Sequence, residues 1–505
     1  CVSGIINEDV NIEVLKKAIN LLVKENDSFR TKLIVNDSIP VQFFSEYIPF
    51  DIDVTKVENK KEFKKIEQQM VEEKFNLINS ELYKFKIVKF PDNTAGIILN
   101  VHHMIADSWS LGITIQEIVK IYKTLLENKE YISDTFSYKN YIESEREYKN
   151  SKRFDKDKEF WNEYLSENVE PVSIPSINRN IEVKSSNGKR ASYVLKKDVM
   201  NKITEFCEKN KISNYVFFMS VFSIYIGNMA NTDKFLLGTP ILNRLNFKDK
   251  KTEGMFVTTV PFKVDIENNT FTEFAINNNI NLMSILRHQK YSYTDIIEDV
   301  RTKNPDIPNL YDIAISYQIT KATADDVGNY TTNWTFNNNC LNDMNIHLYD
   351  INDTGELKVD YDFLTDKYSE KEIENGHNRI IHIIEQIIEN PDINVQDIEI
   401  VTNDEKEQIV NKFNNRKLKC PFDKNIIEIF EEQVVKNEDE IALVYKENQF
   451  TYKELNKIVN KFARFLKEQG INKNDIVGVY MNKNYWFIIS ILAIQKLGAA
   501  YTPMH

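Results

Sequence analysis

VHHMIADSWS, residues 101–110, is the stretch of sequence that decides how this chain folds and where its chemistry lies. It holds two of the seven histidines, and an aspartate follows the second histidine after four residues. An apolar run ends just before the stretch and a helical pattern begins just after it, so we expect a junction between a strand and a helix. A side chain at such a junction is held firmly and can still reach a reactant.

The sequence on both sides supports this junction. The apolar runs LYKFKIVKF (82–90) and AGIILNVHH (95–103) are separated by the turn-rich residues 91–94, which predicts a β-hairpin. After the stretch, Asp107 or Ser108 can cap a helix at its N-terminus. Apolar residues then recur at roughly helical spacing: Trp109, Ile113, Val119, Tyr122 and Leu126.

The two histidines are expected to have different surroundings. Because side chains alternate along a strand, His103 should share a face with Leu99, whereas His102 should share the other face with Asn100. One imidazole is then a packing group and the other is open to a reactant. A neutral imidazole, with an unperturbed pKa of about 6.5, is the default general base.

Other kinds of site find little support. An isolated pair of histidines is more often structural than catalytic. A metal site would need further ligands at fixed spacing, but the cysteines are scattered at positions 1, 207, 340 and 420, and neither HExxH nor CxxC occurs. A serine nucleophile in a GxSxG turn is absent as well. We therefore expect no metal.

HHMIADSWS resembles the HHxxxDG core motif of the condensation domains of nonribosomal peptide synthetases, relatives of chloramphenicol acetyltransferase. Six further segments resemble motifs of that family in the family's order. They are NDSFRTKL (26–33), FSYKNYIESE (136–145), GTPILNR (238–244), GMFVTTVPF (254–262), RHQKYSYTDI (287–296) and LYDIAISYQ (310–318). The resemblance covers nearly all of residues 1–400.

The resemblance implies an α/β fold with two chloramphenicol-acetyltransferase-like subdomains in a V-shaped pseudo-dimer, and an active site between them. We place the N-lobe at 1–168 and the C-lobe at 169–400. The periodicity predicts helices at 12–24, 61–78, 137–165, 197–210 and 214–229. The family's first motif should precede Cys1, so we expect a boundary there and an N-lobe without one edge.

The implied reaction is amide bond formation between a donor acyl or peptidyl thioester and the α-amine of an acceptor aminoacyl thioester. Both substrates would be carried on the phosphopantetheine of partner carrier domains, and the condensation domain itself would bind no cofactor. His103 matches the family's second histidine, as either the base or the group that orients the amine. Asp107 is implied to pair with Arg244 and to shape the site; it is equally a candidate helix cap. His102 is implied to be a scaffold beside them.

Further positions carry weaker expectations. Ser108 stands where the family has glycine, and Thr258 where it has asparagine. Trp109, before Ser110, follows the condensation pattern and not that of epimerization domains. Arg30 is expected to form a salt bridge within the N-lobe, Tyr138 and Tyr141 are expected to pack, and His347 receives no role. Near the substrate or its tunnel the resemblance places Gly254, Phe256, Thr258, His288 and Gln318.

The C-terminal part has a different character. FTYKEL (450–455) and LGAAYTPMH (497–505) resemble the first core motifs of adenylation domains. We therefore expect a linker at 401–425 and the truncated start of an adenylation domain at 426–505. No GxxxxGK[ST] or equivalent phosphate-binding loop is present, so we expect no adenylation activity from this fragment.

Length, charge and cysteine content limit the kinds of binding partner and the cellular compartment that we expect. The 505 residues suffice for about three domain-sized units. The formal charge of −12, without a basic cluster, argues against nucleic acid. No membrane span or signal peptide stands out, and unpatterned cysteines suit a reducing cytoplasm. We expect a monomer. The alternatives are a degenerate domain that only docks carrier proteins, a starter condensation domain with a fatty acyl donor, or a free acyltransferase using acyl-CoA.

Overall fold

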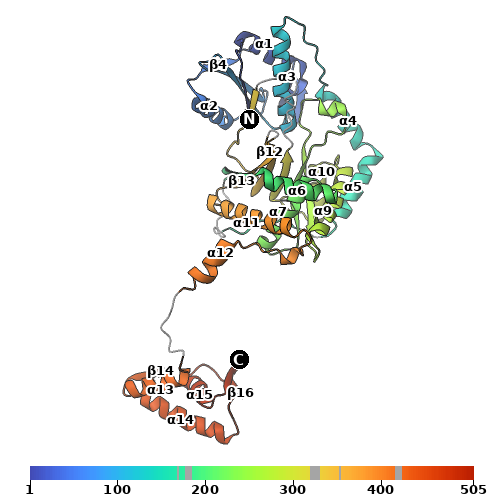
Figure 1. Cartoon of the computed structure of the whole chain (residues 1–505). Coiled ribbons are helices and arrows are strands. Elements are labelled where there is room, and N and C mark those ends of the chain that lie inside the picture. Colours follow the sequence, from blue (N-terminus) through green and yellow to red (C-terminus); the bar gives the residue numbers. More distant parts are fainter. Residues whose placement is uncertain (168–169, 177–184, 319–329, 352–353, 416–422, 505) are drawn as a thin grey trace. The chain divides into compact units, whose positions relative to one another are not determined.

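The computed structural model describes residues 1–167, 170–176, 185–318, 330–351, 354–415 and 423–504. The chain forms two compact units, Cys1–Lys406 and Glu407–His505 (Figure 1). The first unit contains two lobes, each built on one main β-sheet. We describe the two units separately.

The first lobe contains a five-stranded sheet with the order β11-β1-β6-β5-β4. Strands β5 and β6 are antiparallel and joined by a short turn, which confirms the predicted hairpin. The strands are β1 (Val2–Ile6), β4 (Asp53–Lys56), β5 (Tyr83–Lys89), β6 (Ala95–Val101) and β11 (Tyr330–Trp334), and a separate hairpin consists of β2 (Thr31–Asn36) and β3 (Ile39–Phe44).

Both faces of this sheet are covered, which explains why its strands read as nearly continuous apolar runs. Ile97 and Leu99 lie in the core beneath α1 and α3, whereas Ile98 lies in a smaller core beneath α2. The helices of this lobe are α1 (Ile12–Glu25), the short η1 (Asp27–Arg30), α2 (Lys60–Glu72) and α3 (Ser108–Leu126). The predicted helix at 61–78 is therefore too long by six residues.

The apolar residues between positions 109 and 126 that predicted α3 are only partly buried in the core. Trp109 and Leu126 are exposed, with relative accessibilities of 38% and 46%. The residues that pack against α1 and the sheet are instead Leu111, Ile115 and Ile118. The reason is that Trp109 is used in a contact with the second lobe, described below.

Strand β1 lies inside the sheet and has a neighbour on each side. It pairs with β6 on one side and with β11 on the other, both antiparallel. Strand β11 comes from the range that we assigned to the C-lobe, and it joins the sheet of the first lobe. The two lobes are thus tied together by backbone hydrogen bonds.

The second lobe contains a six-stranded mixed sheet with the order β7-β13-β12-β10-β8-β9. Strands β8, β10 and β12 are parallel to one another, so their carboxyl ends lie at one edge of the sheet. The strands are β7 (Gly188–Leu195), β8 (Lys234–Ile241), β9 (Thr258–Asp265), β10 (Ile313–Gln318), β12 (Met344–Ile351) and β13 (Glu356–Leu364).

Helices cover this second sheet. Helices α6 and α7 begin at the predicted residues and end within one residue of the predicted ends. The predicted helical stretch 137–165 is broken into two helices, because Ser151 caps a new helix by accepting a hydrogen bond from the amide of Phe154. The helices are α4 (Tyr138–Lys149), α5 (Lys152–Tyr164), α6 (Lys197–Asn210), α7 (Asn214–Ala230), α8 (Phe247–Lys250), α9 (Phe271–Arg287), α10 (Tyr293–Lys303), α11 (Glu370–Glu389) and the short η3 (Val395–Asp397).

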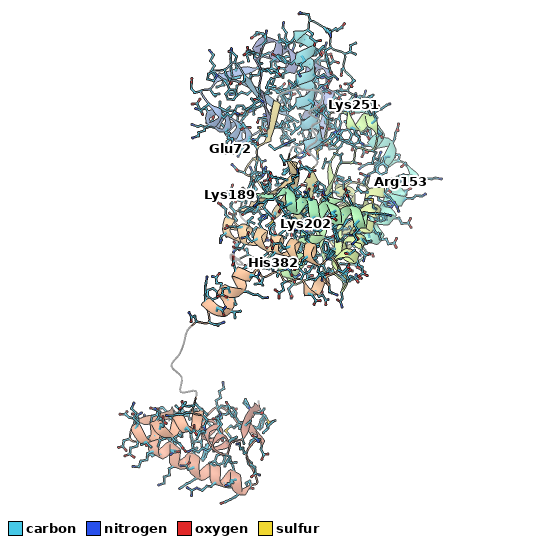
Figure 2. The ribbon with its side chains drawn as sticks, in the orientation of Figure 1. Glu72, Arg153, Lys189, Lys202, Lys251 and His382 are labelled. Atoms are coloured by element: carbon cyan, nitrogen blue, oxygen red, sulfur yellow. The ribbon has the colours of Figure 1, made fainter. Side chains whose placement is uncertain are left out.

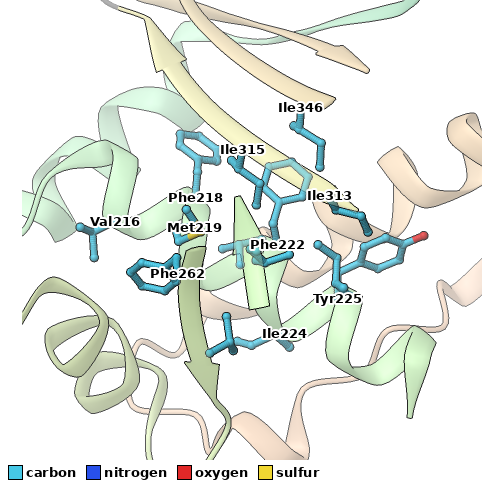
Figure 3. Packing of buried hydrophobic residues seen from close by; sticks show 14 of the residues in the cluster. Val216, Phe218, Met219, Phe222, Ile224, Tyr225, Phe262, Ile313, Ile315 and Ile346 are labelled. Atoms are coloured by element: carbon cyan, nitrogen blue, oxygen red, sulfur yellow. The ribbon is translucent and has the colours of Figure 1, made fainter. Parts of the chain in front are cut away.

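Helix α7 is apolar on every side because it is buried in the core of the second lobe. Its side chains Phe218 and Phe222 lie among residues of β9, β10 and β12, including Phe262 and Ile315 (Figure 3). Among the described residues, no single helix is long and apolar enough to cross a membrane. Helices α6 and α7 pass such a test only as a pair, and they are bent by 105°.

Charged side chains lie on the outside of the first unit. Arg153 on α5, Lys189 on β7 and Lys202 on α6 are exposed (Figure 2). The predicted linker is not entirely irregular, since it contains α12 (Asn403–Glu407) and a π-helical turn (Gln408–Lys412). Glu405 accepts hydrogen bonds from Arg379 of α11. The start of the predicted linker 401–425 therefore packs with the first unit.

The second unit is small and has its own core of α14 and α15 residues. Thr451 and Glu454, both in the FTYKEL segment, form a capping box at the start of α14, which gives that segment a local structural role. The elements are α13 (Ile426–Lys436), β14 (Ile441–Tyr445), β15 (Asn448–Thr451), α14 (Tyr452–Glu468), β16 (Ile476–Tyr480), α15 (Tyr485–Lys496) and β17 (Ala500–Met504).

Candidate active site

The VHHMIADSWS stretch forms the predicted junction. Strand β6 ends at Val101, a turn covers residues 103–105, and α3 begins at Ser108. Asp107 is the N-cap of α3: its Oδ1 accepts a hydrogen bond of 2.8 Å from the backbone N–H of Ser110. Of the two caps that the sequence allowed, the structure uses Asp107.

Asp107 also binds the second lobe, and its side chain is almost completely buried. Arg244 Nη2 lies 3.0 Å from Oδ1 and 3.2 Å from Oδ2. The backbone amides of Phe256 and Val257 donate to Oδ2 at 3.0 and 3.2 Å. The Asp107 carboxylate therefore caps a helix of the first lobe and also accepts hydrogen bonds from three donor groups of the second lobe. The expected contact between Asp107 and Arg244 is present.

Arg244 is held as firmly as its partner. Its Nη1 donates to the carbonyl oxygens of Asp249 and Thr252, and its guanidinium lies 3.9 Å from the centre of the Phe256 ring. The side chain of Arg244 has no exposed surface. A buried ion pair is stabilised only if its remaining donors and acceptors are satisfied, and here most of them are. The exception is Arg244 Nε, which has no hydrogen-bond partner among the residues that the structure describes.

Ser110 adds a second contact between the lobes. Its Oγ donates to the carbonyl oxygen of Gly254 at 2.6 Å and accepts from the Gly254 amide at 3.0 Å and from Arg244 Nη2 at 2.7 Å. Nearby, the indole Nε1 of Trp109 donates to the carbonyl oxygen of Lys250 at 3.0 Å. The first turn of α3 is thus fixed to the segment 249–257 of the second lobe.

Glu253 is a buried acid at this interface. Thr114 Oγ1 donates to its Oε1 at 2.9 Å, and Oε2 has no partner among the described residues. Burial raises the pKa of the Glu253 carboxyl well above its usual range, with Asp107 and Glu117 adding to the rise and Thr114 and Arg244 opposing it. The site therefore favours the protonated form of Glu253.

The two histidines differ as the sequence predicted. The ring of His102 packs edge-on against Phe75, with centroids 5.9 Å apart, and its Nδ1 accepts a hydrogen bond of 3.3 Å from the amide of Met104. Burial lowers the pKa of His102, and the neighbouring His103 adds to this. His102 is therefore a neutral packing group.

His103 lies in the turn after β6 and is exposed. Its ring has no hydrogen bond or ion pair with any residue that the structure describes. It thus differs from His102, whose ring is used in packing. The anchored Asp107 fixes the end of this turn, so the position of His103 depends on the contact between the lobes.

Several other predicted residues lie at this interface. Phe256 forms an aromatic cluster with Tyr138 and Tyr141, with centroid distances of 5.6 and 4.0 Å, and the packing role predicted for the two tyrosines is confirmed. The Tyr138 hydroxyl donates to the carbonyl oxygen of Met255. A Cβ atom at Gly254 would overlap the Tyr138 ring, so the glycine is required for close packing.

The two positions that depart from the family pattern lie beside these contacts. Ser108 is the first residue of α3 and does not have a positive φ, so the backbone there does not require glycine. Thr258 begins β9, opposite Ile241 of β8 and directly after Val257. Neither substitution interrupts the contacts of Asp107.

The contacts of two predicted residues, His288 and Arg30, lie outside this interface. His288 stacks on Phe160 at 4.0 Å, and its Nδ1 lies 2.7 Å from Asp157 Oδ1, so its contacts are with α5. Gln318 is the last residue of β10. The expected salt bridge of Arg30 is not present, since its Nη1 donates to the carbonyl oxygen of Ser45 and no described carboxylate lies within salt-bridge distance.

Sequence reasoning missed Ser110, Thr114 and Glu253. Ser110 is three residues after Asp107 and Thr114 one helical turn further, so both lie on the face of α3 that Asp107 begins. Glu253 directly precedes the GMFVTTVPF segment. No spacing rule links residues that come from different lobes.

Within the described ranges, no group of three or more His, Cys, Asp or Glu side chains is arranged to hold a metal ion. Cys1, Cys207 and Cys340 are free thiols, and position 420 lies outside the described residues.

Comparison with known proteins identifies two family models in the chain. The family model of the condensation domain matches residues 2–410, and that of the AMP-binding enzyme matches residues 430–505. Surfactin synthase subunit 1 of Bacillus subtilis (strain 168) is 31% identical over 505 residues, covering 98% of this chain and 14% of that protein. Bacitracin synthase 2 of Bacillus licheniformis is 25% identical over 512 residues, covering 99% of this chain and 19% of that protein. The chain thus spans less than a fifth of the length of these two relatives.

Solved structures show the same fold. A four-domain nonribosomal peptide synthetase bound to AMP and glycine matches with a TM-score of 0.73 at 18% identity, covering 99% of this chain and 39% of that one. A starter condensation domain of rhizomide synthetase matches with a TM-score of 0.69 at 16% identity, covering 79% and 90%. The expected fold class is confirmed. This chain belongs to the condensation-domain family of nonribosomal peptide synthetases and continues into part of an AMP-binding domain.

Proposed function

We propose that the first unit forms an amide bond between a donor acyl or peptidyl thioester and the α-amine of an acceptor aminoacyl thioester. Each substrate is carried on the phosphopantetheine arm of a carrier domain, one acting as donor and the other as acceptor. Family membership supports the reaction class. The chain acts as a monomer in the cytoplasm, with the AMP-binding domain in cis.

One observation carries this proposal. The Asp107 carboxylate holds the start of α3 and the second lobe together, and the exposed His103 lies in the turn that Asp107 ends. An imidazole without an internal partner is available to a substrate, and its turn is fixed from both lobes. His102 is neutral and packed, so we assign it the role of scaffold.

The reaction needs positioning and one proton transfer. The amine nitrogen attacks the carbonyl carbon of the thioester, the C–S bond then breaks, and the amine proton leaves as the thiolate is released and protonated. Alignment of two bound reactants can supply roughly 7–11 kcal/mol of the barrier. A general base adds typically about 10²–10⁴ in rate. In our proposal His103 faces the reacting amine, while Asp107 and Arg244 keep its turn in place.

The test is a single-turnover condensation assay with donor and acceptor carrier proteins loaded with acyl and aminoacyl groups. We expect His103→Ala to lower the rate by about 10²–10⁴ and to leave thermal stability nearly unchanged. His382→Ala, which changes a histidine of α11, is the matched control and should retain full activity. Equal product from the wild-type chain and His103→Ala would refute the assignment of His103.

The same assay separates a base from an orienting group. If His103 is the base, the rate loss in His103→Ala is reduced at high pH, where more of the amine is already deprotonated. If His103 orients the amine, the loss is independent of pH. No product from any chain would favour a domain that only docks carrier proteins.

A further inference from the structure

A cavity of about 290 Å³ lies in the second lobe, where α7, α11 and one face of the sheet meet. Its lining is mostly apolar and includes Phe222 and Met229 of α7, Ile346 of β12 and Ile373 of α11. Figure 3 shows Phe222, Tyr225 and Ile346 among the neighbouring core residues. The interior of a folded protein contains few voids larger than a water molecule. The cavity is therefore a distinct feature of this lobe.

The volume and the apolar lining of the cavity indicate what it can hold. An engineered apolar cavity of about 150 Å³ in another protein stays free of water and binds benzene. Ligand pockets in proteins typically have volumes of about 300–1,000 Å³. The cavity of the second lobe lies at the lower end of this range. It has room for a compact apolar ligand of about ten to twelve non-hydrogen atoms.

The cavity is separate from the candidate active site. The described residues that line it form none of the hydrogen bonds that join Asp107, Ser110 and Arg244 to the segment 249–257. It lies on the α7 side of the sheet, because Ile346 and Phe222 belong to the same core. The proposed amide-forming reaction therefore does not use this space.

Gly376 of α11 lets a tyrosine of α7 approach the helix at the side of the cavity. A Cβ atom at Gly376 would lie 2.7 Å from the Tyr225 hydroxyl oxygen, and both residues line the cavity. A glycine inside a helix is less favourable than an alanine. The glycine is present although it lowers the stability of the helix, and it brings the Tyr225 hydroxyl close to the guanidinium of Arg379.

Arg379 is the cationic residue in the cavity lining. Its Nε donates to both oxygens of Glu405, at 3.1 and 3.2 Å, and its Nη2 donates to Oε1 at 2.7 Å. Its Nη1 contacts the Sδ atom of Met229 at 3.2 Å. A thioether is a weak acceptor, and each Nη group carries two N–H donors. Nη1 can therefore donate a stronger hydrogen bond to a ligand.

The charges around the cavity favour a neutral ligand. Burial raises the pKa of Glu405, but hydrogen bonds and charge from Arg379 and Thr402 outweigh burial, and the pKa is lowered overall. The ionised Glu405 already balances the charge of the guanidinium. Glu372 of α11 also lines the cavity, so a ligand carboxylate would lie near two side-chain carboxylates. A carbonyl oxygen can accept from Nη1 without this repulsion.

We infer that the cavity binds a small, neutral, apolar molecule with one carbonyl oxygen. The carbonyl oxygen accepts a hydrogen bond from Arg379 Nη1, and the hydrocarbon part packs against Phe222, Ile346 and Ile373. Binding at this site is independent of the proposed amide-forming reaction.

Three matched probes test the inference by calorimetry on the full chain. They are 4-phenylbutan-2-one, butylbenzene, which lacks the carbonyl group, and 4-phenylbutanoate, which replaces the ketone with a carboxylate. One hydrogen bond from a guanidinium is worth about tenfold in affinity. We expect the wild-type chain to bind the ketone about tenfold more tightly than either of the other two probes.

Variants separate the hydrogen bond from the apolar contacts. Arg379→Leu should bind the ketone and butylbenzene with equal affinity, whereas Arg464→Leu, which changes an exposed arginine of α14, should retain the wild-type preference. Ile373→Phe should weaken binding of both probes, because the larger ring occupies the cavity. Glu405→Gln should raise the affinity for 4-phenylbutanoate about tenfold, because Glu405 no longer balances the guanidinium charge. Thermal unfolding shows whether each variant is folded.

The outcomes decide the inference without reference to turnover. The expected order of the three probes, together with the loss of the ketone preference in Arg379→Leu, supports the site. If the wild-type chain binds none of the probes, the inference is overturned. It is also overturned if 4-phenylbutanoate binds the wild-type chain more tightly than the ketone, or if folded Arg379→Leu keeps the full ketone preference. None of these results changes the expected effect of His103→Ala on amide formation.

Discussion

Asp107 of the first lobe and Arg244 of the second lobe form a buried ion pair, with Arg244 Nη2 3.0 Å from one carboxylate oxygen of Asp107 and 3.2 Å from the other. The relative accessibility of these side chains is 1% and 0%. The same carboxylate caps α3 and accepts two backbone amides of the second lobe. One side chain thus couples the folding of a helix to the junction of the lobes and to the turn that carries His103.

The first prediction concerns this pair. Arg244→Ala should lower the free energy of unfolding by about 3–5 kcal/mol, because it leaves Asp107 as an uncompensated buried charge. We expect the condensation rate to fall as much as it does in Asp107→Ala. The control is Lys371→Ala, which removes an exposed pair with Glu374 and should change stability by less than about 0.5 kcal/mol. Near-normal thermal stability and turnover in Arg244→Ala would contradict the prediction.

The second prediction concerns Gly254. Gly254→Ala should cost about 1–3 kcal/mol of stability, because the added methyl group overlaps the ring of Tyr138. In the double variant with Tyr138→Leu, part of this loss should be recovered. Gly112→Ala is the control, since a Cβ at Gly112 of α3 would meet no other described atom within 4 Å beyond its chain neighbours and the backbone of its own helix. There we expect a gain of up to about 1 kcal/mol. If denaturant unfolding shows equal losses of unfolding free energy in the two alanine variants, the steric explanation is contradicted.

The third prediction is a pH dependence due to Glu253. Its pKa in the folded chain is raised by burial, so the folded chain holds a proton that the unfolded chain releases above its ordinary pKa. Wild-type stability therefore includes a penalty that grows as pH rises above about 4.5. Glu253→Gln removes this penalty and keeps an acceptor for Thr114. We expect the variant to gain melting temperature relative to wild type between pH 5 and pH 8. A difference that is constant with pH would contradict the buried acid.

The fourth prediction concerns acid sensitivity at His377. The ring stacks on Tyr193 at 4.0 Å and its Nδ1 lies 3.0 Å from the Tyr361 hydroxyl, and burial lowers its pKa to about 4. In the unfolded chain the ring binds a proton below about pH 6.5, so stability is complete above that value and is lost as pH falls toward 4. The loss should amount to about 3 kcal/mol. The penalty should be absent in His377→Gln, measured by chemical denaturation from pH 7.5 to 4.5. A parallel loss in both chains would show that His377 is not the cause.

Local features of the fold could be predicted from the sequence because they depend on neighbouring residues. The hairpin, the junction, and helices α6 and α7 follow from apolar period, turn residues and caps, which act over a few positions. The different surroundings of His102 and His103 agree with strand alternation, even though both residues lie just past the end of β6. The predicted helix 137–165 was wrong in its middle, because the cap at Ser151 interrupts a pattern that is otherwise continuous.

Contacts between residues that are far apart in the sequence could not be predicted from local patterns. Arg244 was placed opposite Asp107 by family resemblance, and nothing in its spacing from Asp107 indicates the contact. The pairing of β11 with β1 and the position of Arg30 were not anticipated, because they depend on which surfaces meet after the elements have formed.

The sequence by itself determined the strand-to-helix junction around HHMIADSWS, the family and the candidate base, since local periodicity and motif order are properties of the chain alone. Only the tertiary structure decided that Asp107, Ser110 and Thr114 contact Arg244, Gly254 and Glu253. Hydrogen bonds and ion pairs act over a few ångströms of space, and residues more than a hundred positions apart reach that distance only when both lobes have folded and packed.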